Sequence, residues 1–305
     1  GFPVSRRRIA FGCINYLSTR YFAAEAPRWY LNINSGRNVF DYYHGDPRVS
    51  PDQSDILKKI QSRKECFMGI RVSNTRIAGL MSDIGFKGRL SIIPIGIDYG
   101  VFEAQHSLSK IDIRRKYGIP IDAVCVGSFQ KDGVGWGDGE DPKYIKGPDI
   151  FLKTMGALYP KCKQLYVILT GPSRGYLSAG LRSLGLPYLH IDLQNYLEIA
   201  KVYRALDFYL ITSREEGGPK GLLEAMAAGV PVVTTPVGQA IDLVMTGLNG
   251  LMANSFSPDE LADLCMNLLQ MGSAERDSLT EKAMSTAREG DYNMQSALWQ
   301  DFLSL

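Results

Sequence analysis

The sequence predicts an α/β protein built from two domains. At 305 residues the chain is longer than the ~250–300 residues over which a single core keeps growing. In its second half, short β-branched and aromatic runs alternate with amphipathic stretches of helical length, which is typical of parallel α/β units. Each expected strand is followed by a polar or glycine-rich loop. In open α/β sheets, ligands bind outside the carboxyl ends of the strands, so these loops are the expected site.

The second half contains most of the predicted elements. The expected strands are Ala123–Phe129, Leu165–Thr170, Tyr188–Asp192, Phe208–Thr212 and Val230–Thr234. The expected helices between them are Pro148–Leu158, Tyr176–Leu184, Tyr196–Ala205 and Lys220–Ala228.

The first half contains fewer predicted units. The expected strands are Arg7–Cys13, Val39–His44, Gly69–Ser73 and Leu90–Ile95, with helices over Asp52–Arg63 and Thr75–Asp83. Three further helices are expected at the end of the chain, over Pro258–Met271, Ala274–Arg288 and Met294–Leu303. A domain boundary is expected near Phe102–Ser109.

Composition limits the class of protein. Hydrophobic residues make up 45% of the chain and charged residues 22%, as in soluble globular proteins. Five widely spaced cysteines without a CxxC pair argue against a disulfide framework or zinc site and favour a reducing compartment. Residues 1–104 hold 15 Lys/Arg and 9 Asp/Glu, or +6, whereas the remainder carries −4. This basic half can attract an anionic substrate or a membrane surface, or it is ordinary surface variation.

The segment Ser213–Gly229, SREEGGPKGLLEAMAAG, carries the strongest chemical signal. An apolar strand precedes it, and an alanine- and leucine-rich helix follows its glycine turn. Pro219 suits the first helical position, because its missing N–H would have no partner there. A strand, a glycine turn and a helix N-terminus together favour a phosphate through free N–H groups and the helix dipole.

Two carboxylates, Glu216 and Glu224, flank this predicted anion site. They make sense beside a phosphate if they accept hydrogen bonds from ribose or sugar hydroxyls. The alternative is a capping Glu216 and a solvated Glu224, as in any αβ unit.

The segment resembles the E-x7-E signature of retaining glycosyltransferases of family 4, which have the two-Rossmann, B-type (GT-B) architecture. Glu216 and Glu224 stand at the two glutamate positions with seven residues between them. Residues 225–233 and 237–250 are similar to that family's continuation, with Asp242 where glutamate is more common. Upstream, Arg71-Val72-Ser73 and Ile93–Asp98 resemble the end of its first domain. The resemblance covers roughly residues 38–305.

This resemblance implies two Rossmann-like domains facing across a cleft, the N-terminal one reduced. The expected domains are residues 1–104 on the acceptor side and 105–289 for the nucleotide sugar. Residues 290–305 are expected to form a helix that packs back on the first domain.

The resemblance also implies roles for the turn residues. Glu224 is expected to bind the ribose of the donor, and Glu216 to lie against the transferred sugar. The expected backbone contacts to the sugar and diphosphate come from Gly217, Gly218, Pro219, Lys220 and Gly221. A one-face reaction in which the leaving phosphate assists the acceptor hydroxyl requires neither a cofactor nor a metal ion.

A glycine-rich loop after the first strand of the family's second domain usually supplies an Arg and a Lys to the diphosphate. Gly127 and the pair Lys146-Gly147 match it, Ser128 stands at the Arg position, and Lys131 is a possible substitute. The loop 130–146 is long and acidic. A flap over the donor, a surface excursion and a calcium site are the alternatives, although its spacing differs from that of an EF-hand.

The first domain gives weaker signals. His44 ends a predicted strand and resembles the family histidine that faces the donor sugar; a structural histidine is the alternative. His190 falls where such folds hold the nucleotide base. The stretch 15–38 replaces several strand–helix units, so Tyr16, Arg20, Arg28 and Trp29 either line an acceptor pocket or cover a small sheet.

The expected function is a retaining, metal-independent transfer from a nucleoside-diphosphate sugar, catalysed by Glu216, His44 and Lys146. The acceptor would be a glycan, lipid-linked or small-molecule hydroxyl, and no nucleic acid is expected as a partner. A cytoplasmic location follows, with possible peripheral membrane contact through the basic half. The alternatives are a nucleotide-sugar epimerase or hydrolase, and a non-catalytic nucleotide- or glycan-binding protein.

Overall fold

The chain folds into two compact units. The computed structural model describes residues 13–49 and 54–304. The first unit comprises Gly1–Ile95 together with Ser296–Leu305, and the second comprises Gly96–Gln295. The predicted boundary near residue 104 therefore lies several residues beyond the division at Ile95. The strand predicted over Arg7–Cys13 falls, but for Cys13, outside the described residues.

The first unit contains a parallel sheet of four strands, arranged in chain order. The strands are β1 (Asn15–Leu17), β2 (Asn38–Tyr42), β3 (Gly69–Val72) and β4 (Arg89–Ile92). Val39 is opposite Gly69 in the register, and Gly69 is opposite Arg89. Because the order is sequential, every crossover steps in the same direction, and right-handed crossovers then place all connecting helices on one face.

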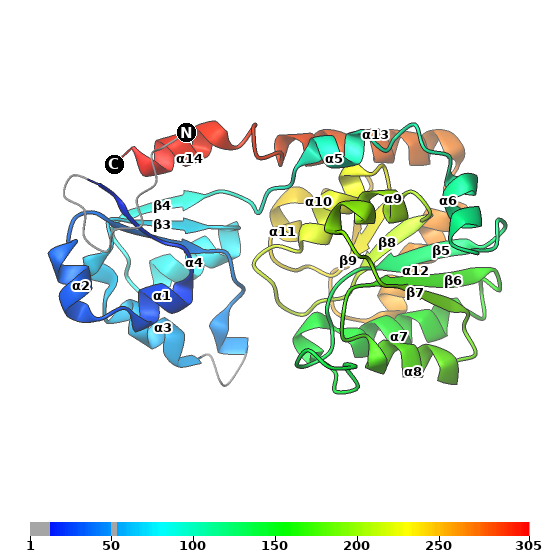
Figure 1. Cartoon of the computed structure of the whole chain (residues 1–305), viewed down its shortest axis with the longest axis horizontal. Coiled ribbons are helices and arrows are strands. Elements are labelled where there is room, and N and C mark those ends of the chain that lie inside the picture. The colour runs from blue at the N-terminus through cyan, green and yellow to red at the C-terminus, as the bar shows by residue number, and fades with distance from the viewer. Residues whose placement is uncertain (1–12, 50–53, 305) are drawn as a thin grey trace. The chain divides into compact units, whose positions relative to one another are not determined.

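Alternate side chains of this sheet enter different cores. Phe40 and Tyr42 pack on the face covered by helices α1–α4, whereas Val39 packs on the opposite face against Phe302 of α14. Figure 1 shows the four helices and α14 on opposite sides of the sheet. The helices are α1 (Arg20–Glu25), α2 (Arg28–Ile33), α3 (Ser54–Gln61), α4 (Thr75–Asp83) and α14 (Ser296–Leu303).

Three of these elements were absent from the sequence prediction: β1, α1 and α2. They are short, and polar side chains fix them. Thr19 caps α1 by accepting the N–H of Phe22, and the buried Asn38 amide donates to the carbonyls of Leu31 and Cys66 at 2.8 Å. Such long-range polar contacts leave no periodic pattern in the sequence.

The second unit contains a parallel sheet of six strands in the order β10-β9-β8-β5-β6-β7. The strands are β5 (Val124–Ser128), β6 (Leu165–Thr170), β7 (Tyr188–Ile191), β8 (Phe208–Ile211), β9 (Val232–Thr234) and β10 (Leu251–Met252). The chain proceeds from β5 to β7 in one direction and then returns to place β8 beside β5. The order therefore reverses between β5 and β8, which makes their carboxyl ends a topological switch point.

Helices cover both faces of this sheet. Helices α7, α8 and α12 form one core with β5 and β6, and α5, α6, α9, α10 and α13 contribute to the other. Figure 1 shows α7 and α8 on one side of the sheet and α10 and α13 on the other. The helices of this unit are α5 (Tyr99–Glu103), α6 (Lys110–Lys116), α7 (Pro148–Leu158), α8 (Gly175–Ser183), α9 (Ile199–Tyr203), α10 (Lys220–Ala227), α11 (Ala240–Leu243), α12 (Pro258–Gln270) and α13 (Ser273–Glu289).

The predicted α/β class with parallel sheets is confirmed. Details differ at element ends: the helix predicted over Tyr196–Ala205 is a 3₁₀ turn (Tyr196–Glu198) followed by α9. Pro219 is the N-cap of α10 rather than its first residue, because its ψ of 105° is extended. Within the described ranges, no helix combines the length and apolar character needed to cross a bilayer.

Candidate active site

A cavity of about 240 Å³ lies at the switch point of the second unit. Its lining comes from the segment that follows β5, from β8 and the segment after it, from the 3₁₀ turn and α9 that follow β7, and from α10. The lining residues are Phe129, Gln130, Tyr196, Ile199, Tyr209, Ile211, Glu216, Pro219, Lys220, Gly221 and Glu224. Five of these, Glu216, Pro219, Lys220, Gly221 and Glu224, belong to the segment that the sequence singled out.

The start of α10 forms one wall of the cavity. Lys220 is its first residue, and Gly221 lies so close to Tyr209 that an added Cβ would be 2.7 Å from the Tyr209 hydroxyl. That hydroxyl accepts the N–H of Phe129 at 3.1 Å. Glycine at 221 therefore lets the positive end of α10 approach the carboxyl end of β5, which creates a surface suited to an anion.

Glu216 is held beside the cavity by two polar neighbours. Its Oε2 lies 2.9 Å from Nζ of Lys146, and its Oε1 accepts the Ser213 hydroxyl at 2.5 Å. Gln130 lies against both partners: its amide N–H donates to the Lys146 carbonyl at 2.9 Å, and its Oε1 lies 3.1 Å from the Ser213 hydroxyl oxygen. The structure therefore joins two predicted residues, Glu216 and Lys146, in one ion pair, although 70 positions separate them in the sequence.

Gly147 explains the position of Lys146. Gly147 has a φ of +65°, and its carbonyl accepts the Thr212 hydroxyl at 2.9 Å. An added Cβ would lie 1.8 Å from the Thr212 carbonyl oxygen. Only glycine permits this combination of left-handed backbone and close approach. The chain thus passes tightly over the end of β8 and delivers the Lys146 ammonium to Glu216.

Glu224 is almost fully buried, with 4% of its surface exposed. The Tyr196 hydroxyl donates to its Oε1 and the Tyr203 hydroxyl to its Oε2 at 3.1 Å, while Nζ of Lys220 lies 3.7 Å from Oε1. Burial raises the pKa of Glu224, and the tyrosine hydrogen bonds and Lys220 oppose that rise. Glu224 is therefore an oriented hydrogen-bond acceptor, not the solvated residue of the alternative interpretation.

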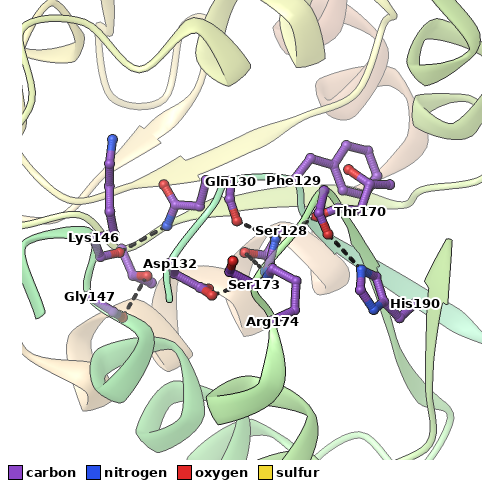
Figure 2. Close-up of polar contacts among 12 residues, drawn as sticks. Ser128, Phe129, Gln130, Asp132, Lys146, Gly147, Thr170, Ser173, Arg174 and His190 are labelled. Atoms are coloured by element: carbon purple, nitrogen blue, oxygen red, sulfur yellow. Dashed lines mark hydrogen bonds and ion pairs between the residues drawn. The ribbon is translucent and has the colours of Figure 1, made fainter. Parts of the chain in front are cut away.

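A buried arginine, Arg174, joins the loops that follow β5 and β6 (Figure 2). Arg174 follows β6; its guanidinium donates to the carbonyls of Thr170 and Gln130 and to the Ser128 hydroxyl at 3.1 Å, and it pairs with Asp132 at 3.2 Å. Burial raises the pKa of Asp132 to about 6, although Arg174 opposes the rise. Because the guanidinium is fully buried, it braces the loops that follow β5 and β6.

Two predicted donor residues, Gly127 and Ser128, lie buried in β5. The resemblance leads one to expect an arginine at Ser128, and here the Ser128 hydroxyl instead accepts a hydrogen bond from Arg174. The next two residues, Phe129 and Gln130, line the cavity. A diphosphate contact from Gly127 or Ser128 stays a prediction.

The loop 130–146 is folded onto the start of α8. Gly133 bridges Pro142 in antiparallel fashion, and the carbonyls of Asp138 and Gly139 accept the N–H groups of Gly175 and Tyr176. Lys131 points to the loop's own Trp136, with Nζ 3.6 Å from the ring centroid.

The acidic residues of this loop do not form a cluster. Asp132 is buried on Arg174. Among residues 13–49 and 54–304, no three His, Cys, Asp or Glu side chains gather so as to hold a metal ion. The proposals of a flap and of a Lys131 phosphate contact remain predictions.

His44 lies in the first unit, just beyond β2. Its ring stacks on Tyr43 with centroids 4.2 Å apart and meets the edge of Tyr21 at 5.2 Å. Burial and the nearby Arg20 guanidinium lower the pKa of His44 to about 4. The imidazole is therefore neutral at pH 7, and it can exchange hydrogen bonds but cannot serve as a proton donor from a charged state.

The other predicted residues of the first unit have local partners. Tyr16 donates to Asp41 at 2.9 Å, Arg20 donates to Tyr42 and Gly45, and Arg28 donates to the Ser62 carbonyl. Trp29 is 61% exposed. In the second unit, His190 bonds the Gly171 carbonyl at 2.7 Å, which ties β7 to the loop after β6.

Sequence reasoning missed several residues that shape the cavity: Gln130, Arg174, Tyr196, Tyr203, Tyr209 and Ser213. Gln130 and Ser213 follow predicted strands, so their position was a usable signal. The three tyrosines lie in or next to predicted elements and resemble ordinary core residues. Tyr196 and Tyr203 precede β8 in the chain, yet their hydroxyls meet on Glu224 of α10, which follows β8.

Comparisons with known proteins match the part of the chain that forms most of this cavity. Residues 138–271, a little under half of the chain, match the family model of the glycosyl transferases group 1. The D-inositol 3-phosphate glycosyltransferase of Corynebacterium glutamicum (strain R) is 27% identical over 194 residues, or 59% of this chain and 43% of that protein. The lipopolysaccharide core biosynthesis mannosyltransferase LpsB of Rhizobium meliloti (strain 1021) is 30% identical over 164 residues, or 52% of this chain and 43% of that protein. The matched part thus spans less than half of each relative.

Solved structures extend the similarity over most of the chain. Sucrose-phosphate synthase from Thermosynechococcus elongatus matches with a TM-score of 0.75 at 16% identity, covering 95% of this chain and 73% of that one. The Anabaena protein HepE, solved in complex with UDP and glucose, matches with a TM-score of 0.72 at 19% identity, covering 92% and 77%. The fold is GT-B. In this GT-B chain, the segment matched by the family model contains Lys146, Glu216 and Glu224.

Proposed function

We propose that this GT-B chain is a retaining glycosyltransferase that moves a sugar from a nucleoside-diphosphate-sugar donor to an acceptor hydroxyl. The observation that carries the proposal is the cavity at the β5–β8 switch point, where a helix N-terminus, Lys146, Glu216 and Glu224 converge. The group 1 family match over residues 138–271 and the transferase names of the relatives support it.

The diphosphate would bind at the start of α10. There the N–H groups of Lys220 and Gly221 and the positive helix end meet the cavity, and Lys146 stands at its edge. Glu216 pairs with Lys146 at 2.9 Å and so fixes the ammonium where it would meet the diphosphate. Fixed positive groups of this kind stabilise the charge that develops on a leaving diphosphate, which is usually the largest catalytic contribution.

The two glutamates would recognise hydroxyl groups. Glu224 is buried and held by tyrosine hydroxyls, so it can accept both hydroxyls of a ribose diol without rearranging its backbone. Glu216 sits between Lys146 and the cavity, which suits contact with the sugar next to the diphosphate. Contacts from Gly127, Ser128, Lys131, Gly217 and Gly218 belong to the same proposal.

In the proposed reaction the glycosidic C–O bond to the diphosphate breaks while the acceptor oxygen bonds to the same face of the sugar carbon. The acceptor proton passes to the departing phosphate oxygen, so neither a protein nucleophile nor a metal is invoked. His44 would contribute a hydrogen bond to the sugar, because its neutral imidazole suits that role better than proton donation.

The first unit would serve the acceptor. Residues 1–104 carry a net charge of +6, and aromatic side chains of α1 and α2 such as Phe22 and Trp29 are about 60% exposed. Basic and aromatic groups together suit an anionic acceptor or the surface of a membrane that carries it.

The test is incubation of the protein with UDP-, GDP-, ADP- and TDP-sugars, with and without an acceptor mixture, followed by mass spectrometry. We expect one donor class to be consumed, with transfer when acceptor is present, and we expect Glu224→Ala to lose at least about 100-fold in kcat/KM. Glu103→Ala, which alters a surface glutamate paired with Arg288, is the matched control. If no donor is bound or consumed and Glu224→Ala changes nothing, the proposal is wrong. Consumption to a free sugar or an epimer alone would favour a hydrolase or epimerase.

A further inference from the structure

Tyr196 bonds the carboxylate to which the proposed function assigns the donor ribose. Its hydroxyl donates to Oε1 of Glu224, and its ring lines the cavity. With Tyr196 in place, only 4% of Glu224 is exposed. A ligand hydroxyl that binds Oε1 from the cavity must therefore compete with the Tyr196 phenol for that oxygen.

The two tyrosines that bond Glu224 differ in how tightly the surrounding residues hold them. Tyr203 lies in the core with 0% exposure and also packs on Phe129 and Tyr209, so its bond to Oε2 is a permanent part of the site. Tyr196 is 52% exposed and begins a single 3₁₀ turn. One oxygen of Glu224 is thus held by the core and the other by a surface side chain.

Lys220 keeps Tyr196 over the carboxylate. Its Nζ lies 4.8 Å from the Tyr196 ring centroid and 3.7 Å from Oε1 of Glu224. The cation therefore attracts both the ring face and the carboxylate. The phenol hydrogen bond also compensates the burial of a charged group, which would be costly if left unmade. These contacts together hold Tyr196 on the Glu224 carboxylate.

We infer that Tyr196 competes with the ribose diol of the donor for Glu224, and so sets how strongly the cavity prefers nucleotides that carry the diol. The inference rests on the proposed function, because it assumes that Glu224 receives the ribose. Donor binding exchanges the Tyr196–Glu224 hydrogen bond for bonds from the diol. The observed affinity is then the intrinsic affinity multiplied by the fraction of molecules in which Tyr196 has released the carboxylate.

The size of the effect follows from one hydrogen bond to a charged group. Such a bond is worth about 1.5 kcal/mol or more, which corresponds to a factor of about ten in the fraction released. Removing the hydroxyl while keeping the ring should therefore tighten ribonucleotide binding. The affinity for a nucleotide without the diol should not change, because such a nucleotide makes no bond to Glu224 and leaves Tyr196 in place.

The experiment is calorimetric titration of wild-type protein and Tyr196→Phe with UDP, GDP and ADP, followed by the 2′,3′-dideoxy form of the tightest binder. We expect Tyr196→Phe to bind the ribonucleotide about tenfold more tightly and the dideoxynucleotide within about twofold of wild type. Tyr188→Phe removes a tyrosine hydroxyl that bonds Arg182 away from the cavity. It serves as the matched control and should change neither affinity.

The outcomes separate the two proposals. If neither wild-type protein nor Tyr196→Phe binds any of the nucleotides, the proposed function and the inference are overturned together. If wild-type protein binds but Tyr196→Phe binds the ribonucleotide equally or more weakly, Tyr196 is not a competitor and the inference alone fails. Equal tightening for the ribonucleotide and dideoxynucleotide would also overturn it, because the hydroxyl would then not act through the diol.

Discussion

The two sheets of this protein use the same parallel α/β pattern but differ in strand order. The first unit runs β1-β2-β3-β4, with every crossover on one face. The second reverses between β5 and β8, with helices on both faces. Its reversal separates the connections that leave two adjacent strands, and the cavity lined by Glu216 and Glu224 lies there.

The ion pairs of the two units also differ in whether a ligand can reach them. In the first unit, Asp41 and Arg71 form a buried pair at 2.8 Å within the sheet, and Trp299 of α14 covers the guanidinium. In the second unit, Lys146 and Glu216 pair at the edge of a cavity. The same kind of ion pair is thus closed off in one sheet and accessible in the other. Strand order, more than residue type, decides which pair can meet a ligand.

The largest expected difference between the two units comes from glycines with a positive φ. Gly147→Ala places a Cβ against the Thr212 carbonyl, whereas Gly36→Ala in the first unit has a similar φ of +76° and no atom within 4 Å of the added Cβ. We expect a loss of unfolding free energy of about 3 kcal/mol or more for Gly147→Ala, and about 1 kcal/mol for Gly36→Ala. Urea denaturation measures both. Equal losses would show that the close approach at Gly147 is not a constraint.

The next effect concerns charge at the cavity. Lys146→Ala removes the cation that Glu216 holds, and we expect a loss of about 100-fold in kcat for the donor with little change in stability. Lys161→Ala removes a surface lysine paired with Asp263 and is the matched control. Steady-state kinetics with the donor identified in the panel provides the measurement. An unchanged kcat would remove Lys146 from the proposed mechanism.

The smallest expected effects are opposite responses to acid. His44 has a folded pKa of about 4, below its unfolded value of about 6.5, so the stability it contributes is present above pH 6.5 and is lost as the pH falls through 4. Asp132 has a folded pKa of about 6, above its unfolded value of about 3.9. Its contribution is full below that unfolded pKa and is lost as the pH rises through 6.

Hydrogen exchange at pH 4.5 and 7 measures these responses separately, in β3 for the first unit and in β6 for the second. At pH 4.5 the free energy of opening should fall in β3, and His44→Gln should reduce that fall by about 2 kcal/mol. In β6 the same free energy should rise, and Asp132→Asn should reduce that rise by about 2 kcal/mol. If protection in the wild-type protein falls in both units between pH 7 and pH 4.5, or rises in both, groups other than His44 and Asp132 dominate the response. The two variants would then differ little from wild type.

Sequence alone predicted the second unit better than the first. Its five longer strands and the helix that begins at Lys220 follow from periodicity and glycine turns, whereas the choice of Glu216 and Glu224 as donor-site residues came from the family resemblance. In the first unit, β1 has three residues and depends on the Asn15 and Asn38 side chains, which no local pattern reveals. Short elements fixed by long-range polar contacts therefore escape sequence reasoning.

Within the site, the residues on one continuous segment were predictable and their partners were not. Tyr196 reaches Glu224 from the 3₁₀ turn after β7 and Tyr203 reaches it from α9, whereas Gln130 contacts Lys146 within one loop. Lys146 and Glu216 come from the segments that follow β5 and β8, so their pairing depends on β8 returning beside β5. Strand order is a property of the whole sheet, so no single segment encodes it. Ser128 stands at the position where the resemblance predicts an arginine. The guanidinium beside it comes instead from Arg174, on the loop after β6.

The most direct test of the donor site at the β5–β8 switch point is hydrogen exchange with and without saturating UDP, GDP or ADP. We expect one nucleotide to slow exchange in the segments 129–131 and 216–224, and to leave β2 and β3 of the first unit unchanged. Slowed exchange confined to the first unit, or no change in any segment with all three nucleotides, would contradict a nucleotide-sugar site built on Glu216 and Glu224.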